Sequence, residues 1–248
     1  TLSSSSAASD VYKRQFPSTE RALRAVQRLT AFSQRSFERT DARPVALTLP
    51  AGRTVVPEYE SKAVLAQAGI PFARGRLATS VEQAVAIASE IGWPVALKAQ
   101  SADLSHKSDA GGVILNIADA QAMGEAWGRL HANVAAYDSA IALDGVLIEA
   151  MGQRGLEMII GARNDPQWGP VILAGLGGVT AEIMRDARLL DADLSTGEVL
   201  RELDRLQGAP LLHGYRGAPA LDRQALAELI VRLGPVSYTH LRAHETGR

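Results

Sequence analysis

Apolar residues recur along the chain with two different periods, which together predict a mixture of helices and strands. Apolar residues three or four positions apart indicate amphipathic helices, whereas short continuous apolar runs between turn residues indicate buried strands. The predicted helices are residues 18–39, 58–69, 79–92, 119–137, 195–206 and 222–233. The predicted strands are residues 94–99, 111–117, 145–151, 156–163 and 169–176. The last strands follow one another without an intervening helix, which favours an α+β arrangement over strict strand–helix alternation.

Capping residues indicate where several of these helices begin and end. Ser18 or Thr19 precedes the first helix, and Asp119 precedes the helix at 119–137. Serine, threonine and aspartate side chains accept hydrogen bonds from the free N–H groups of a first helical turn. Gly69 and Gly92 follow the last periodic residues of their helices, as expected of C-terminal caps.

The two ends of the chain do not have the pattern of a folded protein. "SSAASDVYKRQ" (Ser5–Gln15) and "VSYTHLRAHET" (Val236–Thr246) back-translate into opposite strands of one DNA element and its flanks, similar to the transposon end and adapters of sequencing libraries. The alternative is a flexible Ser/Ala-rich arm and an aromatic tail. We expect residues 1–15 and 235–248 to be adapter-derived and set them aside before interpreting the fold. Residues 40–56, which are polar and contain prolines, are interpreted as a linker.

Composition narrows the class of protein. With 46% hydrophobic and 21% charged residues in 248, the chain is globular. A net charge of −1 offers no field for nucleic acid or an anionic membrane, and no apolar run reaches the roughly 18 residues of a membrane span. The chain has no cysteine, which excludes a disulfide framework, a thiol nucleophile and a thiolate metal site. We therefore expect a cytoplasmic protein.

Two neighbouring polar residues stand out against their surroundings. Lys98 lies inside the apolar strand "PVALKA", where an unpaired ammonium would cost several kcal/mol. It either meets an anion or extends from an edge strand into water. His106 follows in "SADLSHKSDAGGV", a polar loop that ends in Gly111 and Gly112. An imidazole there can act as a base, a ligand or a phosphoryl acceptor, or it can simply be solvated; no second histidine stands at metal-ligand spacing.

Further candidates lie near the later strands. Glu149 in "VLIEAM" and Glu157 in "LEMIIGAR" are close to strand ends, where a carboxylate can reach a ribose hydroxyl or a cation, or can be solvated. "GLGGVTAEIMRD" contains a glycine turn followed by Asp186, and "HGYRGAP" places Arg216 between two glycines. A guanidinium suits phosphate or carboxylate, but an exposed loop arginine is equally common.

Taken in order, these motifs resemble one family. "ESK.VL...GIP", "G.PVALK..S..L.HKSD.GGV.LN", "GVLIEAM....LEMIIG...D...GPVI..GLGG...E...D" and "L.G.RG.P..D" are similar to the ATP-grasp domain of ADP-forming acyl-CoA synthetases, the acetate–CoA ligase group. The resemblance covers residues 57–234. It implies an α+β ATP-grasp fold of two α+β subdomains with a nucleotide cleft between them, truncated at the C-terminus. Residues 16–39 resemble the tail of a preceding CoA-ligase domain in the fused, single-chain form.

The resemblance implies a role for each candidate. His106 matches the histidine that accepts phosphate from ATP and then carries it, on a moving loop that Gly111 and Gly112 would hinge, to the CoA-ligase site. Lys98 matches the lysine that meets ATP phosphates. Residues 149–151 match the strand beside adenine and ribose. The candidate nucleotide-binding residues are Lys98, Glu149, Ala150, Met151 and Glu157, with the backbone of Ala150 and Met151 reading the base. Asp186 and Arg216 match motifs without an assigned role.

The resemblance also implies cofactors and partners. ATP/ADP and Mg²⁺ are expected here, while CoA and the acyl substrate bind to domains outside this sequence. In the family an "E.D.NP" stretch after the last helix supplies the magnesium ligands; it is absent here, so the ligands stay unknown and the fragment is expected to be inactive alone. The expected partner is a CoA-ligase domain in the same chain or in a partner subunit.

The predicted function is the ATP-binding, phosphohistidine-relay part of an acid–thiol ligase. Such an enzyme converts a carboxylic acid, CoA and ATP to acyl-CoA, ADP and phosphate. The main alternative is a nucleotide-binding regulatory module of a fused protein acyltransferase that does not turn over. A biotin-carboxylase-like enzyme is less favoured because it needs no histidine relay.

Overall fold

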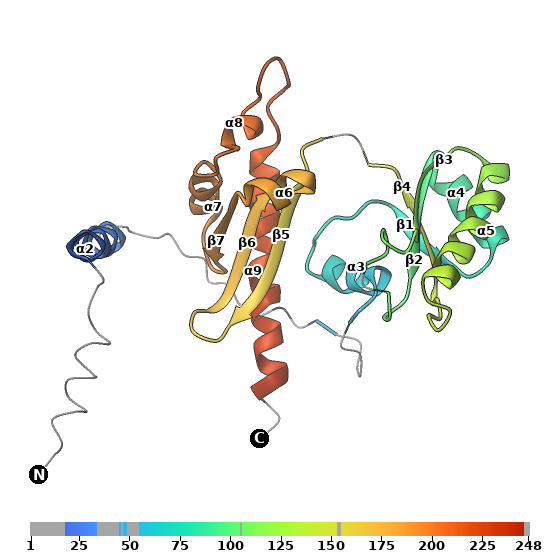
Figure 1. The fold of residues 1–248 in the computed structure, drawn as a ribbon, viewed down its shortest axis with the longest axis horizontal. Helices are drawn as coiled ribbons and strands as arrows, with labels where there is room; N and C mark the ends of the chain where they lie inside the picture. Colours follow the sequence, from blue (N-terminus) through green and yellow to red (C-terminus); the bar gives the residue numbers. More distant parts are fainter. Residues whose placement is uncertain are drawn as a thin grey trace, which may run out of the picture. The chain divides into compact units, whose positions relative to one another are not determined.

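The computed structural model describes residues 18–33, 45, 47–48, 55–104, 106–152 and 155–245 (Figure 1). The chain divides into two compact units, residues 1–39 and 40–248. In the first unit, helix α2 (Thr19–Ser33) begins after Ser18, whose Oγ accepts a hydrogen bond from the N–H of Arg21 at 3.3 Å. The adapter-derived prediction for residues 1–15 and most of the predicted linker at 40–56 lie outside the described residues.

The second unit contains two sheets, and we name the parts after them. The N-terminal lobe, residues 55–152, contains a four-stranded antiparallel sheet in the order β1-β4-β2-β3. Its elements are α3 (Glu58–Gln67), β1 (Gly75–Ala78), α4 (Val81–Ile91), β2 (Val95–Gln100), β3 (Val113–Ile117), α5 (Ala120–Tyr137) and β4 (Gly145–Ala150). Figure 1 shows α4 and α5 packed against one face of this sheet, with α3 near the other face.

Alternation along β2 decides which residues form the core and which face α3. Side chains on a strand point alternately to its two faces. Val95, Leu97 and Ala99 are fully buried in the cluster that also includes residues of α4 and α5. Burying one such aliphatic side chain contributes about 1.5 to 3 kcal/mol. Lys98 and Gln100 therefore point to the opposite face, where the amide oxygen of Gln100 accepts a hydrogen bond from the N–H of Tyr59 on α3.

The C-terminal lobe, residues 155–245, contains a three-stranded antiparallel sheet in the order β5-β6-β7. Its elements are β5 (Met158–Asp165), β6 (Gly169–Leu176), α6 (Gly178–Met184), β7 (Ala187–Asp191), α7 (Thr196–Leu203), α8 (Ala209–Leu212) and α9 (Arg223–Glu245). Helix α9 runs along β5 and β6 and packs against α7 (Figure 1). The hairpin between β5 and β6 turns at Gly169, which has a φ of +75°.

Most predicted elements are confirmed. The caps at Asp119 and Gly92 are also confirmed: the Asp119 side chain accepts from the N–H of Ala122 at 2.8 Å, and Gly92 has a φ of +100°. The short elements β1, β7, α6 and α8 were not predicted. The last helix was predicted to end at 233, whereas α9 continues through Pro235 to Glu245. Those added residues lie in the stretch 235–248, whose adapter origin stays a prediction.

Asp186 connects three parts of the C-terminal lobe. The side chain is buried, and its two oxygens accept hydrogen bonds from the N–H groups of Gln207 and Gly208, at 2.9 and 2.7 Å. The carbonyl oxygen of Asp186 accepts from the N–H of Leu176 on β6 at 3.1 Å. Asp186 thus joins β6, the start of β7 and the turn before α8. These contacts explain the residue structurally, without a ligand.

Replacing Asp186 should therefore destabilise the fold. Asp186→Ala leaves the buried N–H of Gly208 without its acceptor, and we expect the free energy of unfolding to fall by about 2 to 3 kcal/mol. Urea denaturation measures the change. Gln224→Ala, on the exposed surface of α9, is the control and should change stability by less than about 0.5 kcal/mol. Equal effects of the two substitutions would contradict this role.

Candidate functional site

Lys98 is partnered by two carboxylates on the α3 side of the sheet. Its Nζ lies 3.0 Å from Oε1 of Glu58, the first residue of α3, and 3.1 Å from Oε2 of Glu149 on β4. Glu149 reaches the same face because Ala96 of β2 pairs with it in the antiparallel register. Of the two alternatives for this lysine, the structure shows the paired one: Lys98 meets anions and does not simply extend into water.

Two more lysines complete this group. Nζ of Lys62 lies 2.7 Å from Oε1 of Glu58 and 2.5 Å from Oε2 of Glu149. Nζ of Lys107 lies 2.7 Å from Oε2 of Glu58. We call Glu58, Lys62, Lys98, Lys107 and Glu149 the lysine–glutamate cluster. Its three cations and two anions leave one net positive charge on a half-buried surface.

The neighbouring charges of the cluster favour the ionised forms of Glu58 and Lys98. Burial raises the pKa of Glu58, but hydrogen bonds from Lys107, Lys62 and Lys98 outweigh burial and lower that pKa from its ordinary value of 4.5 to about 2. Burial lowers the pKa of Lys98, but the hydrogen bonds and charges of Glu58 and Glu149 outweigh it and raise the pKa above 10.5. Both groups are therefore charged at neutral pH.

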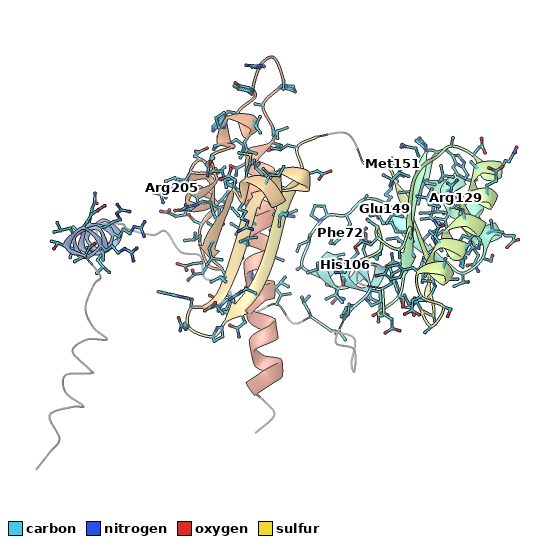
Figure 2. The ribbon with its side chains drawn as sticks, viewed as in Figure 1. Phe72, His106, Arg129, Glu149, Met151 and Arg205 are labelled. Carbon is cyan, nitrogen blue, oxygen red and sulfur yellow. The ribbon has the colours of Figure 1, made fainter. Side chains whose placement is uncertain are left out.

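His106 lies beside this cluster. An open pocket of about 450 Å³ is lined by Lys98, His106, Val113 and neighbouring residues of the loop and α3; the remaining lining residues are Glu58, Lys107, Ser108 and Asp109. The His106 side chain is exposed and not buried among apolar groups. Figure 2 shows His106 and Glu149 in the same lobe, on the side of the sheet where α3 lies. A nucleophilic ring and a paired lysine therefore share one open pocket.

The two glycines after His106 are held by contacts with neighbouring residues. Gly111 has a φ of +61°, and its carbonyl oxygen accepts a hydrogen bond from Nδ2 of Asn133 on α5 at 3.1 Å. The N–H of Gly112 donates to the carbonyl oxygen of Lys107 at 2.8 Å. Both glycines allow close packing: a Cβ at Gly111 would come within 2.7 Å of Asn133, and one at Gly112 within 3.1 Å of Ala99. These contacts anchor the loop in the conformation seen here, and the role of the two glycines as a hinge stays a prediction.

Residues 149–151 differ in whether their polar groups are free to contact a nucleotide. Glu149 is engaged by lysines, as described above. The N–H of Ala150 donates to the carbonyl oxygen of Arg74 at 2.8 Å, so a contact from that N–H to a base would require this bond to break. Met151 follows the end of β4 and is half-buried (Figure 2). The assignment of Ala150 and Met151 to base recognition stays a prediction.

Glu157 belongs to the other lobe and to the second glycine turn. Its carbonyl oxygen accepts from the N–H of Gly177 at 2.7 Å, and a Cβ at Gly178 would lie 2.4 Å from its carboxylate. Glycine is favoured at this turn because Gly178 has a φ of +60° and a Cβ at Gly177 would lie 3.0 Å from the backbone of Glu157. Arg216, with a φ of +50°, lies over the ring of Tyr215 at 5.5 Å. Neither residue belongs to the lysine–glutamate cluster.

Sequence reasoning missed Glu58, Lys62 and Lys107 as site residues. The signal was present in part, because Lys62 belongs to the "ESK" motif and Lys107 to the "HKSD" motif. Among the described residues, no group of three or more histidines, aspartates or glutamates is arranged to hold a metal ion. Within the same part of the chain, no helix has the length and apolar character needed to cross a bilayer.

The lowered pKa of Glu58 predicts an acid-sensitive contribution to stability. Because the folded-state pKa lies below the ordinary one, the contribution is complete above about pH 4.5 and is lost as the pH falls towards about 2. Glu58→Gln should therefore lose less stability across that window than the wild type, by on the order of 1 kcal/mol after solvent screening. Urea denaturation at several pH values measures it. Parallel profiles would show that the lysines do not hold this carboxylate.

Comparisons with known proteins identify the family of this chain. A family model described as an ATP-grasp domain matches residues 48–240. The chain is 54% identical over 222 residues to a trans-feruloyl-CoA synthase from an unknown prokaryotic organism, a match that covers 89% of this chain and 31% of the synthase. It is 36% identical over 185 residues to the β subunit of the ADP-forming acetate–CoA ligase II of Pyrococcus furiosus, covering 75% of this chain and 78% of the subunit.

Solved structures give the same result. An acetyl-coenzyme A synthetase 1 of Ca. Korarchaeum cryptofilum, in complex with coenzyme A and Ca-AMPCP, matches with a TM-score of 0.74 and 35% identity, over 76% of this chain and 82% of that one. In a second structure of that protein, with coenzyme A and Mg-AMPPCP, the phosphohistidine segment points towards the nucleotide-binding site; the TM-score is 0.65 at 33% identity, over 75% and 80% of the two chains. The predicted family and α+β fold class are confirmed: the chain belongs to the ATP-grasp domain family, in the group that contains the β subunits of ADP-forming acetate–CoA ligases.

Proposed function

We propose that this chain is the ATP-binding, phosphohistidine-relay part of an ADP-forming acyl-CoA synthetase. The observation that carries the proposal is the pocket that His106 shares with Lys98. The ammonium group of Lys98 is contacted by the carboxylates of Glu58 and Glu149. Relatives support it, because those that match this chain at 30% identity or more include ADP-forming acetate–CoA ligases and an acyl-CoA synthase. The chain spans 31% of the length of the feruloyl-CoA synthase, so the reaction of the complete protein is part of the proposal.

The lysine–glutamate cluster suits phosphate binding. Lys62 and Lys98 already bind carboxylate oxygens in a half-buried setting, and phosphate oxygens are acceptors of the same kind. Incoming phosphates would compete with Glu58 and Glu149 for the two ammonium groups. The net positive charge of the cluster favours that exchange, and it brings the terminal phosphate towards the pocket where His106 lies.

The proposed chemical step uses His106 as a nucleophile. A ring nitrogen of His106 attacks the γ-phosphorus of ATP; the bond between that phosphorus and the β–γ bridging oxygen breaks, and ADP leaves with the electron pair. An imidazole can form this bond and release the phosphoryl group again near neutral pH. The exposed position of His106 leaves its ring accessible. The phosphoryl group would then pass to a carboxylic acid, and CoA would displace it as phosphate.

Mg²⁺ belongs to the proposal as the ion that neutralises charge between phosphate oxygens. Among the described residues, no group of three or more histidines, aspartates or glutamates is arranged to hold a metal ion, and Glu58 and Glu149 are bound by lysines. We therefore assign no ligands and derive no step through the ion.

The remaining components would come from a CoA-ligase domain, in the same chain or in a partner subunit. A match of 222 residues cannot fit within residues 40–248, so the feruloyl-CoA synthase also aligns with part of α2. That overlap favours the fused arrangement and supports residues 16–39 as the tail of a preceding domain.

The proposed location of this enzyme is the cytoplasm, which supplies ATP and whose reducing conditions fit a chain without cysteine. The alternative of a regulatory module without turnover is not favoured, since the relatives are ligases and synthases.

The relay is tested with γ-labelled ATP. In the complete synthase, the wild type should acquire an acid-labile label and His106→Ala should acquire none, because the substitution removes the nucleophilic nitrogen. In the presence of a carboxylic acid substrate and CoA, the rate of phosphate release by His106→Ala should also fall, by about a thousandfold or more relative to the wild type. His131→Ala, on α5, is the matched histidine control and should label normally. Label retained in His106→Ala would remove the relay from the proposal.

The phosphate role of Lys98 is tested by nucleotide affinity. Lys98→Met keeps much of the side-chain volume and removes the charge, and we expect ATP affinity to fall about 10- to 100-fold. Arg76→Met, at an exposed cation of the same lobe, should leave affinity within about twofold. Isothermal titration with a non-hydrolysable ATP analogue measures both. Unchanged binding by Lys98→Met would move the phosphates away from the cluster.

A further inference from the structure

We propose that Glu58 is a positioning residue: through Lys107 it holds the His106 loop against the lysine–glutamate cluster, and this ion pair opens whenever the loop leaves. The inference rests on the proposed function, since it assigns a regulator to the same phosphoryl transfer. It adds a residue that the sequence motifs did not single out. We call the pair of Glu58 and Lys107 the loop latch.

The two oxygens of Glu58 have different partners. Oε1 faces Lys62 and Lys98, which belong to α3 and β2, at 2.7 and 3.0 Å. Oε2 faces Lys107, which directly follows His106 in the loop, at 2.7 Å. One carboxylate therefore connects the fixed part of the lobe to the segment that carries the histidine. The side chains of Glu58 and Lys107 are only 26% and 18% exposed, so solvent screens the pair less than an ordinary surface pair.

Among the described residues of the loop, the latch is the side-chain ion pair found next to His106. Leu104 and Ala110, on either side, are both buried. Beyond Ala110, the contact between Asn133 and Gly111 fixes the chain to α5. Between these points, backbone hydrogen bonds close a tight turn. The N–H of Ala110 donates to the carbonyl oxygen of His106 at 3.4 Å, and the N–H of Gly112 donates to the carbonyl oxygen of Lys107 at 2.8 Å. A displacement of His106 larger than a side-chain rotation requires this turn and the ion pair to open together.

Nucleotide would act on the latch in two stages. Phosphates that draw Lys62 and Lys98 away from Oε1 leave Glu58 with Lys107 alone, so the loop stays at the nucleotide while transfer occurs. After transfer, the phosphoryl group on His106 is a strong anion next to Lys107 in the sequence. It competes with Glu58 for that ammonium and repels the Glu58 carboxylate. Phosphorylation of His106 therefore weakens the ion pair between Glu58 and Lys107 that held the loop for the transfer. A relay needs this order, in which the loop is held before the transfer and released after it.

Hydrogen exchange tests the latch without any reaction. We expect the amides of Ala110, Gly111 and Gly112 to exchange about fivefold faster in Glu58→Gln and in Lys107→Gln, the factor that a pair of this kind supports. The double variant should exchange no faster than either single one, since both remove the same contact. Lys107→Arg, which keeps the charge, and Glu90→Gln, which breaks an exposed pair with Arg76, should stay within about twofold of the wild type. Unchanged exchange in the single variants, or additive effects in the double one, would overturn the proposal.

A kinetic arm separates positioning from binding. In the complete protein, Lys107→Gln should slow the labelling of His106 by ATP about fivefold more than it weakens ATP binding, because Lys107 is on the loop side of Glu58. Equal losses of rate and affinity, or no loss of either, would count against the latch. If the wild type itself takes up no label, the relay fails, and the exchange measurement still decides whether Glu58 holds the loop.

Discussion

The arrangement of the N-terminal lobe depends on one constraint, which is that an ammonium group on the inner stretch of a sheet must be neutralised locally. Alternation along β2 buries Leu97 among the residues of α4 and α5 and directs Lys98 to the opposite face. That charge is tolerable because α3 begins with Glu58 and β4 presents Glu149 in register. The same constraint places α3, orients the loop after β2 through Lys107, and leaves an open pocket beside His106.

The lobes contain buried carboxylates of two different kinds. Asp186 receives two backbone N–H groups and has no lysine or arginine among the partners described above, so it stabilises a turn. In the described part of the chain, the side-chain partners found for Glu58 and Glu149 are lysine ammonium groups, which can exchange one anion for another without opening the backbone. This difference separates a structural acid from an exchangeable one. It explains why two motif residues of similar burial, Glu149 and Asp186, receive different interpretations.

Local signals in the sequence predicted the regular elements well. Asp119 and Gly92 define helix ends by chemistry within a few residues, and the apolar runs define the longer strands. Strand β1 escaped prediction because two of its four residues are exposed and it lacks an apolar alternation; it exists through its pairing with β4. Helix α8 is only four residues long and is similarly a product of its surroundings.

The site was predicted in part, and the missing part is long-range. His106 and Lys98 stood out because each is unusual for its neighbours, and they do share a pocket. The partners of Lys98 lie 40 and 51 residues away in the sequence, so no local pattern could pair them. The contact that fixes Gly111 is long-range in the same way, because it comes from Asn133 on another element. The glycine at position 111 correctly indicated an unusual backbone conformation, but its presence does not indicate whether that backbone moves.

The most direct test is a crystal structure of the complete protein with Mg²⁺ and a non-hydrolysable ATP analogue. The account predicts phosphate oxygens on Nζ of Lys62 and Lys98, in place of contacts that Glu58 and Glu149 make here, with the ring of His106 facing the terminal phosphate. Phosphates bound elsewhere, with both lysines still paired to their glutamates, would contradict it.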